Sequence, residues 1–437
     1  MRRELTALGR LAGPILVTQL GSMLLGLVDT AVVGRVSESA LGAVGLGSSI
    51  YFTISVLGFG WMLALDPLIA QAVGAGEPDR ARRLFWQGIW VALAGTLPLS
   101  LLVLLVGTQS SHLGIPPDVA RQVGPYLMAR ALGILPFLLL AASRSYLQAH
   151  EVTRPLVVGV LVANVVNLPL SWALVFGEFG LPRLGAEGAG WASTVATVLQ
   201  LLVALIWVKG LWTGPAWFRP AAAEIRKVLR LGTPIGLQLV AEVGSFAVVS
   251  FLMGNLGTLA LGAHSVTLTC ISVSFQMAVA LGSAASVRVG HAVGRDDAPA
   301  ARKSGFVAIG VGTSMMLIGA ALFVTVPRSL ARLLTDEVSV IEATVPLFAI
   351  ASCFQISDGL QAVAAGALRG AGDTRWPLVA NLFGHYAIGV PLGAGLAFGL
   401  DWGASGLWWG LSAGLTAVAV GLTARFAVLT RTSIQRA

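Results

Sequence analysis

The chain is poor in charged residues. Only 11% of its 437 residues are Asp, Glu, Lys or Arg, whereas an ordinary soluble domain has about 25%. This deficit excludes an ordinary water-soluble globular protein. Hydrophobic residues make up 56% of the chain, and the mean hydropathy is +0.83. These values indicate an integral membrane protein.

Cysteine and histidine are scarce as well. The two cysteines, Cys270 and Cys353, lie in apolar segments without C-x-x-C spacing, so they indicate neither a redox motif nor a disulfide. We expect both to be small core residues. The five histidines are scattered and show no metal-ligand spacing. The sequence also has no long linker and no soluble domain, and we expect no cofactor other than a transported ion.

The apolar residues occur in long runs. Each run has roughly 20 residues, which is the length a helix needs to cross the hydrocarbon core, whereas a barrel strand needs about 9–11. We predict an all-α integral membrane protein with twelve transmembrane helices. They lie near residues 11–33, 43–66, 86–107, 124–147, 156–177, 189–208, 232–254, 261–287, 305–326, 344–368, 377–399 and 404–428. The basic start, MRRELTALGR, leads into the first span without an A-x-A-like cleavage site, so we do not expect a signal peptide.

Positive charge is distributed unevenly among the connections. If the N-terminus is cytoplasmic, the cytoplasmic segments carry 22 of the 28 Lys and Arg, with clusters at 80–83, 226–230 and 302–303. This asymmetry is the positive-inside bias, and it explains the net charge of +8 without a nucleic-acid partner. We predict a multi-pass protein of a bacterial inner membrane with both termini in the cytoplasm.

The chain repeats itself after 220 residues. Residues 10–15 match 230–235, and residues 72–74 match 292–294. Each repeat holds six predicted spans, an even number, so the two repeats should enter the membrane in the same orientation. We predict three parts: an N-terminal six-helix lobe over 1–208, a cytoplasmic inter-lobe linker over 209–231 and a C-terminal six-helix lobe over 232–437. Rocking of one lobe against the other would give alternating access.

Three acidic residues lie inside the predicted spans: Asp29, Glu242 and Asp358. An aspartate at the bilayer centre costs about 2.5–3.5 kcal/mol on insertion scales, and intramembrane acids usually handle protons, metal ions or cationic substrates. Glu242 and Asp358 fall about halfway along their spans, so their carboxylates could share a cation or a proton. Asp29 falls late in the first span, and its repeat counterpart is Val249. The two repeats therefore share the arrangement of their spans but differ in their intramembrane acidic residues.

The roles of several other residues stay open at this stage. Asp66 precedes Pro67 near the end of the second span and can be a capping or a functional residue. Arg130 and Arg144 lie in or near the fourth span and can pair with acids. Four phenylalanines can either line a cleft or pack in the core: Phe246, Phe251, Phe275 and Phe354.

Several of these segments resemble motifs of the multidrug and toxic compound extrusion family, and in particular of its NorM-like branch. The similar segments are VDTAVVGRVS around Asp29, PLIAQAVGAG at 67–76, the stretch 241–268 with Glu242, and FQISDGLQAVAAGALRGAGDT with Asp358. The resemblance covers essentially the whole chain. It implies a V-shaped pair of six-helix lobes. It also implies a monomeric transporter, not an enzyme, which exports cationic or amphiphilic small molecules in exchange for H⁺ or Na⁺.

The resemblance also implies which residues bind ions. Glu242 and Asp358 would form a cation site in the second lobe, with Na⁺ as a possible occupant. Asp29 would form a site in the first lobe. The supporting polar residues of the first site would be Asn164, Asn167 and Ser171.

The sequence departs from the family pattern at two of these places. Ser171 stands where members often have a second asparagine, and Phe354 stands where a tyrosine is common. Both changes remove a polar ligand from the neighbourhood of an acid. Since Na⁺ needs several oxygen ligands and a proton needs one carboxylate, these departures favour H⁺ or mixed use.

Two other functions compete with cation export. A flippase for a lipid-linked precursor must engage an anionic pyrophosphate, which requires basic residues in the cleft, but the mid-span charges here are mainly acidic. A membrane-embedded enzyme such as a polyprenyl glycosyltransferase requires paired acids or metal ligands on loops and a sizeable extramembrane domain. The sequence shows neither.

Overall fold

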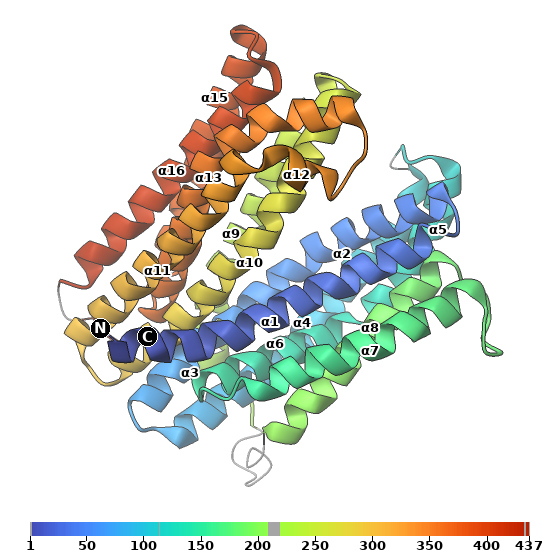
Figure 1. Ribbon diagram of the computed structural model, residues 1–437. Coiled ribbons are helices and arrows are strands. Elements are labelled where there is room, and N and C mark those ends of the chain that lie inside the picture. The colour runs from blue at the N-terminus through green and yellow to red at the C-terminus, as the bar shows by residue number, and fades with distance from the viewer. Residues whose placement is uncertain (1, 113, 209–218, 432–433, 437) are drawn as a thin grey trace. The chain divides into compact units, whose positions relative to one another are not determined.

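The computed structural model describes residues 2–112, 114–208, 219–431 and 434–436, and in these ranges it contains helices and turns but no β-strand (Figure 1). The first half contains α1 (Arg2–Val33), α2 (Glu38–Leu63), α3 (Leu65–Gly74), α4 (Pro78–Thr108), η1 (Ser110–His112), α5 (Pro117–Ala131), α6 (Ile134–Ala149), α7 (Arg154–Phe176) and α8 (Ala186–Trp207). The second half contains α9 (Ala222–Asn255), α10 (Thr258–Gly294), α11 (Ala298–Thr325), α12 (Pro327–Arg332), α13 (Val338–Gly370), α14 (Arg375–Leu382), η2 (Phe383–Gly389), α15 (Val390–Ala394), η3 (Gly395–Gly399) and α16 (Gly403–Leu429).

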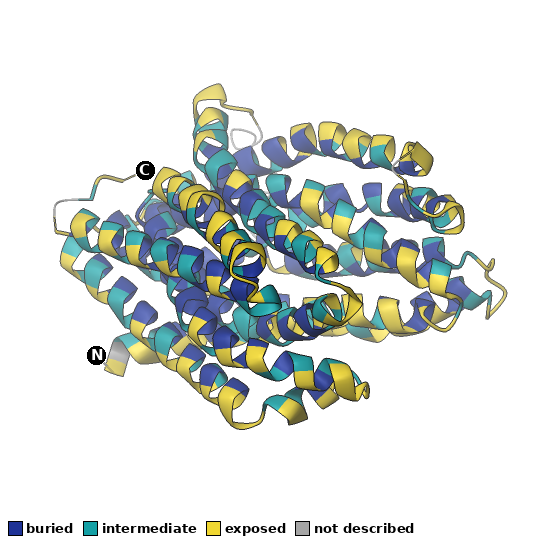
Figure 2. Ribbon diagram, turned by 90° about the horizontal axis from the view of Figure 1, so that it is seen from above, coloured by how far each residue is buried: buried dark blue, intermediate teal, exposed yellow. Residues whose placement is uncertain are grey.

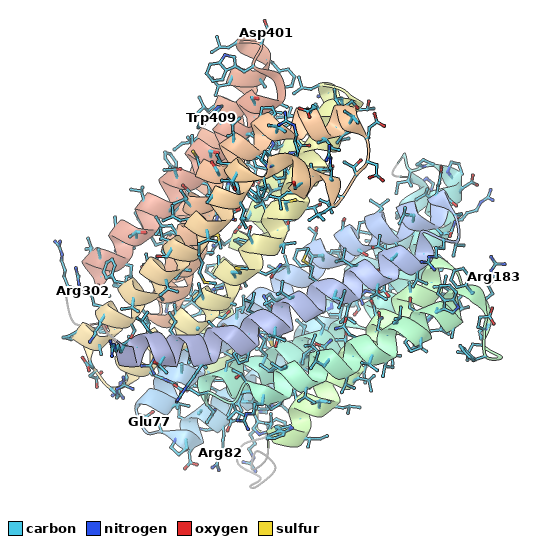
Figure 3. The ribbon with its side chains drawn as sticks, viewed as in Figure 1. Glu77, Arg82, Arg183, Arg302, Asp401 and Trp409 are labelled. Carbon is cyan, nitrogen blue, oxygen red and sulfur yellow. The ribbon has the colours of Figure 1, made fainter. Side chains whose placement is uncertain are left out.

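The predicted all-α membrane fold is confirmed. In the described parts of the chain, eleven helices are long and apolar enough to cross a membrane, and the bent pair α5 and α6 supplies the twelfth span. Charged side chains such as Glu77, Arg183 and Asp401 lie at helix ends and turns (Figure 3). Exposed residues form stripes along the helices, with buried residues on the opposite faces (Figure 2).

The fourth span is broken, although the sequence predicted an unbroken helix over 124–147. Helix α5 ends at Ala131, α6 begins at Ile134, and the two are bent by 45°. Pro136 explains the break, because it has no N–H to donate to the carbonyl of Leu132 and its ring would clash with that carbonyl. The turn at Leu132 and Gly133 is therefore the place where the span changes direction.

The described residues form two compact units. The N-terminal unit comprises Val17–Ile69 and Glu77–Gly236, and the C-terminal unit comprises Ala70–Gly76, the chain from Leu237 onward and the start of the chain up to Leu16. These units differ from the predicted lobes at 1–208 and 232–437. Of the predicted linker, 209–218 lies outside the described residues, and α9 begins within the rest.

The start of α1 belongs to the C-terminal unit for a reason of packing. Leu8, Leu11 and Ile15 are buried in a core with residues of α10, α11, α13 and α16, including Leu281 and Phe426. The chain passes between the units after Leu16, Ile69, Gly76 and Gly236. The first and last of these positions are 220 residues apart, the offset of the repeat, whereas the short excursion at Ala70–Gly76 has no counterpart in the second half.

Glycines allow two helix ends of the C-terminal unit to meet at backbone distance. A Cβ atom added to Gly74 of α3 would lie 2.3 Å from the carbonyl oxygen of His291 in α10. A Cβ atom added to Gly294 of α10 would lie 2.1 Å from the carbonyl oxygen of Gln71 in α3. Since Gly294 and His291 are the repeat counterparts of Gly74 and Gln71, each contact is the image of the other. Only glycine fits at such an approach.

Candidate functional site

Asp29 lies in a polar cluster within the N-terminal unit. It stands four residues before the end of α1 and is only 3% exposed. The amide nitrogen of Asn167 in α7 donates to Oδ1 at 3.3 Å. The hydroxyl of Ser193 in α8 donates to Oδ2 through a short hydrogen bond. Three helices therefore hold this carboxylate in place.

A buried guanidinium accompanies Asp29. Arg130, near the end of α5, lies close enough to interact electrostatically with Asp29 and Tyr126. Its guanidinium carbon is 4.0 Å from the centre of the Tyr51 ring, which is a cation–π geometry. The Tyr126 hydroxyl is 2.8 Å from that of Ser48. The charge of Asp29 is thus partly compensated by a fixed cation inside the same unit.

The other polar residues expected at this site divide into two groups. Ser171 is buried close to Asp29, although its hydroxyl makes no hydrogen bond within the described residues. Asn164 lies elsewhere, because its amide nitrogen donates to the carbonyl oxygens of Gly21 and Val160 at 2.9 and 2.8 Å. Arg144 also stands apart from Asp29, and its guanidinium donates to Gln19 at 3.2 Å.

Glu242 of α9 and Asp358 of α13 come together in the C-terminal unit. The two carboxylates are near enough to repel one another, and Gln361 lies next to both. Gln361 Nε2 donates to Glu242 Oε1 at 3.2 Å, whereas Gln361 Oε1 has no hydrogen-bond donor among the described residues. Asn381 of α14 lies beside Glu242 and makes no hydrogen bond with a described residue.

Both acids line one pocket of about 220 Å³. The remaining lining residues come from α9 and α10 and are Val243, Phe246, Leu268, Ile271, Ser272 and Phe275. The walls are thus mainly apolar, and the two carboxylates supply most of their polar character. An apolar pocket that contains a few polar groups is the usual form of a small-molecule or ion site.

Both carboxyls, when ionised, would place two negative charges beside a single nearby guanidinium. Arg369 of α13 is the positive group that acts on Glu242. Within the described residues no three Asp, Glu, His or Cys side chains converge on one point. A metal cation held here would therefore depend on the two carboxylates and on neutral oxygens such as Gln361 Oε1. A proton or a cation would relieve the repulsion between the carboxylates.

The residues left open by the sequence have distinct surroundings. Asp66 is buried in the first turn of α3, where a negative charge interacts favourably with the helix dipole. Phe246 and Phe275 line the pocket. Phe354 is buried against Phe246 and Trp408, whereas Phe251 is 71% exposed. The four phenylalanines therefore do not act as one set.

Sequence reasoning missed three residues of these clusters: Ser193, Gln361 and Asn381. Gln361 follows Asp358 by three positions, which places both on one face of a helix, so spacing alone could have identified it. Asn381 is a polar residue within an apolar span, so its polarity could likewise have identified it. Ser193 carried none, because serine is ordinary in membrane helices and its contact with Asp29 joins residues 164 positions apart.

Comparison with known proteins places these clusters in a family context. The MatE family model matches residues 14–173 and again 234–394, and the two matches begin 220 residues apart. The chain is 36% identical to a probable multidrug resistance protein NorM of Bradyrhizobium diazoefficiens, covering 97% of this chain and 93% of that one. It is 37% identical to a probable multidrug resistance protein NorM of Deinococcus radiodurans, covering 92% and 90%. The crystal structure of the eukaryotic MATE transporter AtDTX14 matches with a TM-score of 0.88 and 25% identity over 98% of each chain.

Proposed function

Because the chain belongs to the MatE family, whose members are transporters and not enzymes, we propose that it exports organic cations from the cell in exchange for H⁺ or Na⁺. The names of its relatives support multidrug efflux as the activity. The transporter would act as a monomer and would need no cofactor beyond the coupling ion.

One observation carries this proposal: Glu242 and Asp358 face one apolar pocket inside a membrane-spanning bundle. Two carboxylates with one guanidinium acting on them are costly inside a membrane, which gives the pocket a strong preference for a further positive charge. A proton, a sodium ion and a cationic drug can each supply that charge. Competition among them for the same two carboxylates is sufficient to couple their movements.

The exchange then follows from charge balance. When the coupling ion arrives from outside, it neutralises the Glu242–Asp358 pair, and a cationic drug loses its counter-charge and dissociates. After the site turns toward the cytoplasm, the ion leaves and the carboxylates attract the next cation. Exchange of one monovalent ion for one monovalent drug moves no net charge, so the concentration gradient of the coupling ion drives the cycle. The membrane potential, worth about 2.3 kcal/mol per charge at 100 mV, contributes only when more than one ion enters for each drug.

The size of the pocket separates the roles of ion and drug. Its volume of about 220 Å³ is below the roughly 300–1,000 Å³ of typical drug sites. We therefore assign the coupling ion to the pocket itself. The drug would interact with the carboxylates at the mouth of the pocket and occupy additional space outside it.

Asp29 would be a second ion site with a different balance of charge. The nearby guanidinium of Arg130 and the donors on Ser193 and Asn167 all favour a charged carboxylate. Binding of Na⁺ would leave this cluster with a net positive charge, whereas binding to the Glu242–Asp358 pair reduces a negative one. We therefore propose that Na⁺, if it is used, binds in the C-terminal unit.

We place the protein in a bacterial inner membrane with both termini in the cytoplasm. The support is the positive-inside bias, since 22 of the 28 Lys and Arg fall on the side that contains the N-terminus.

Efflux of ethidium from cells tests the proposal. Glu242→Gln and Asp358→Asn should each abolish efflux while the protein is still made and inserted. Glu342→Gln is the matched control, because Glu342 lies on the same helix as Asp358 but is exposed. Normal efflux in both pocket variants would contradict the assigned role of the carboxylates. Absence of efflux in the well-expressed wild type would contradict the proposed substrate class.

A further inference from the structure

Two adjoining pockets lie between the start of α1 and the helices α10 and α11 of the C-terminal unit. Their volumes are about 250 and 590 Å³, and they share Leu5, Val311 and Met315 as lining residues. We name the two together the α11 groove. Its other lining residues are mainly apolar residues of α1, α10 and α11, together with Lys303 and Ser314.

The groove exists because the C-terminal unit has smaller residues than the N-terminal unit at equivalent positions of the repeat. With the offset of 220, Leu281 and Gly310 correspond to Trp61 and Trp90. In the N-terminal unit the Trp61 indole donates to the hydroxyl of Thr233 at 3.2 Å. The same ring lies 2.5 Å from a Cβ atom placed on Gly95, which shows how closely it packs. Trp61 therefore fills its part of the equivalent region in the N-terminal unit, whereas Trp90 is 37% exposed.

The C-terminal unit has smaller residues at these positions, leucine in place of Trp61 and glycine in place of Trp90. A Cβ atom added to Gly9, Gly13 or Gly310 meets no atom within 4 Å. Gly13 replaces the threonine to which Trp61 donates in the other repeat. All three glycines are exposed on the surface of the unit, so the hollow is open to an external ligand.

One end of the groove carries a positive charge. Lys303, in the second turn of α11, is exposed and lines the larger pocket. Arg302 beside it is already engaged, because its guanidinium donates to the carbonyl of Ala427 at 2.8 Å and lies over the Phe306 ring. Arg302 and the start of α1 lie at the same end of this unit (Figures 1 and 3). Among the described residues Lys303 has no ion-pair partner.

We propose that the α11 groove binds an anionic phospholipid, with one acyl chain along the groove and the phosphate at Lys303. The lining from Lys303 to Ile318 spans sixteen residues of α11, which is fifteen rises of the helix and therefore about 22 Å. One leaflet of hydrocarbon is about 15 Å thick, so a single acyl chain can follow the groove from the headgroup region inward.

The charge of the groove separates this ligand from the transported cations. The described lining residues include one basic side chain and no acidic one. The nearest acidic residue of α1, Glu4, is held by Arg288 and Ser304. A cationic drug would meet Lys303 without a counter-charge, whereas a phosphate would be attracted to it. The inference thus does not depend on the proposed transport activity.

Native mass spectrometry of the purified protein tests this assignment. The protein is incubated with an equimolar mixture of phosphatidylglycerol and phosphatidylcholine, and the lipids that remain bound are counted. The wild type should retain one phosphatidylglycerol in preference to phosphatidylcholine. Lys303→Gln should reduce this preference about fivefold, which matches the contribution of one basic residue beside an anionic lipid. Lys303→Arg should preserve it.

Filling the groove supplies an independent test. Gly310→Trp introduces the residue of the other repeat and should remove the retained lipid whatever its headgroup. Gly421→Trp is the control, since a Cβ atom at Gly421 of α16 also meets nothing within 4 Å, and it should leave retention unchanged. Three results would each overturn the proposal: equal retention of both lipids by the wild type, full retention by Gly310→Trp, or displacement of the lipid by ethidium.

Discussion

The ion pair between Glu4 and Arg288 should hold the start of α1 on the C-terminal unit. Arg288 Nη2 lies 3.0 Å from both carboxylate oxygens of Glu4, and the Ser304 hydroxyl donates to the same carboxylate at 3.2 Å. The side chains are 23% and 18% exposed for Glu4 and Arg288, respectively. The perturbation is a double-mutant cycle made of Glu4→Gln, Arg288→Gln and the double variant.

The expected coupling free energy follows from the distance between the two charges and from their burial. Two unit charges 3.0 Å apart attract by about 5 kcal/mol at an effective dielectric constant of about 20. Desolvation of both groups offsets most of this attraction. We therefore expect a coupling free energy of about 1–3 kcal/mol, the upper part of the range typical of residues in one ion-pair network. This coupling corresponds to roughly a 5- to 150-fold change in the opening equilibrium of the helix start.

Hydrogen–deuterium exchange of residues 2–16 in nanodiscs measures that opening. Each single variant should speed exchange of these amides, and the double variant should be little faster than the faster single one. The pair Arg328–Glu342 is the control, because its contacts are shorter, at 2.7 and 2.8 Å, but its side chains are 57% and 51% exposed. Exposed pairs contribute little, so the same cycle at this pair, read from the exchange of the α12 amides, should show no measurable coupling. Additive effects at Glu4 and Arg288 would refute the reasoning.

Three further outcomes are expected. Gly236→Ala should lower the free energy of unfolding by about 1–3 kcal/mol, because its Cβ atom would lie 2.7 Å from the Leu57 carbonyl oxygen. Gly254→Ala is the control and should leave the free energy of unfolding unchanged, because a Cβ atom there has open space. Thermal unfolding measures both variants. Ser193→Ala should impair ethidium transport because Asp29 loses a charge-assisted donor worth about 1.5–3 kcal/mol, and Ser193→Thr should retain transport. Burial, with Arg82 nearby, lowers the pKa of His150 just beyond the end of α6. As the pH falls, the His150 side chain is protonated in the unfolded chain before it is protonated in the folded one. The free energy of unfolding is therefore unaffected above the ordinary pKa and falls as the pH drops below about 6.5. Thermal unfolding at several pH values should show a smaller acid loss in His150→Gln.

The number and placement of the spans could be predicted because the bilayer imposes one length and one polarity on each of them. The same rule could not show where a span breaks. The bend at Leu132 depends on Pro136, and the second span is interrupted at Ala64 and resumes at Leu65 as α3. Both are local backbone events inside otherwise apolar runs.

The candidate site was partly readable from the sequence for a similar reason. Acids in apolar spans are rare enough to stand out, which is why Asp29, Glu242 and Asp358 could be selected. Their neighbours depend on which helix faces meet, and that information is distributed over residues far apart in the chain. Asn164 and Asn167 differ by one helical turn, yet only Asn167 donates to Asp29.

The packing of the start of α1 illustrates a third limit. The repeat located the duplication at an offset of 220, and the family model matches with the same offset. However, a duplication in sequence does not state which unit each helix packs against. The start of α1 is buried with the second half of the chain because Leu8, Leu11 and Ile15 complete the core there.

Ethidium transport by the purified protein in liposomes, driven by an imposed gradient, tests the central claim most directly. One arm applies a proton gradient without Na⁺, the other a Na⁺ gradient at equal pH, and each compares the wild type with Glu242→Gln, Asp358→Asn and the Glu342→Gln control. The account predicts that at least one gradient drives ethidium movement in the wild type and the control, and that neither gradient drives it in the two pocket variants. Gradient-driven ethidium movement that persists in both pocket variants would contradict it.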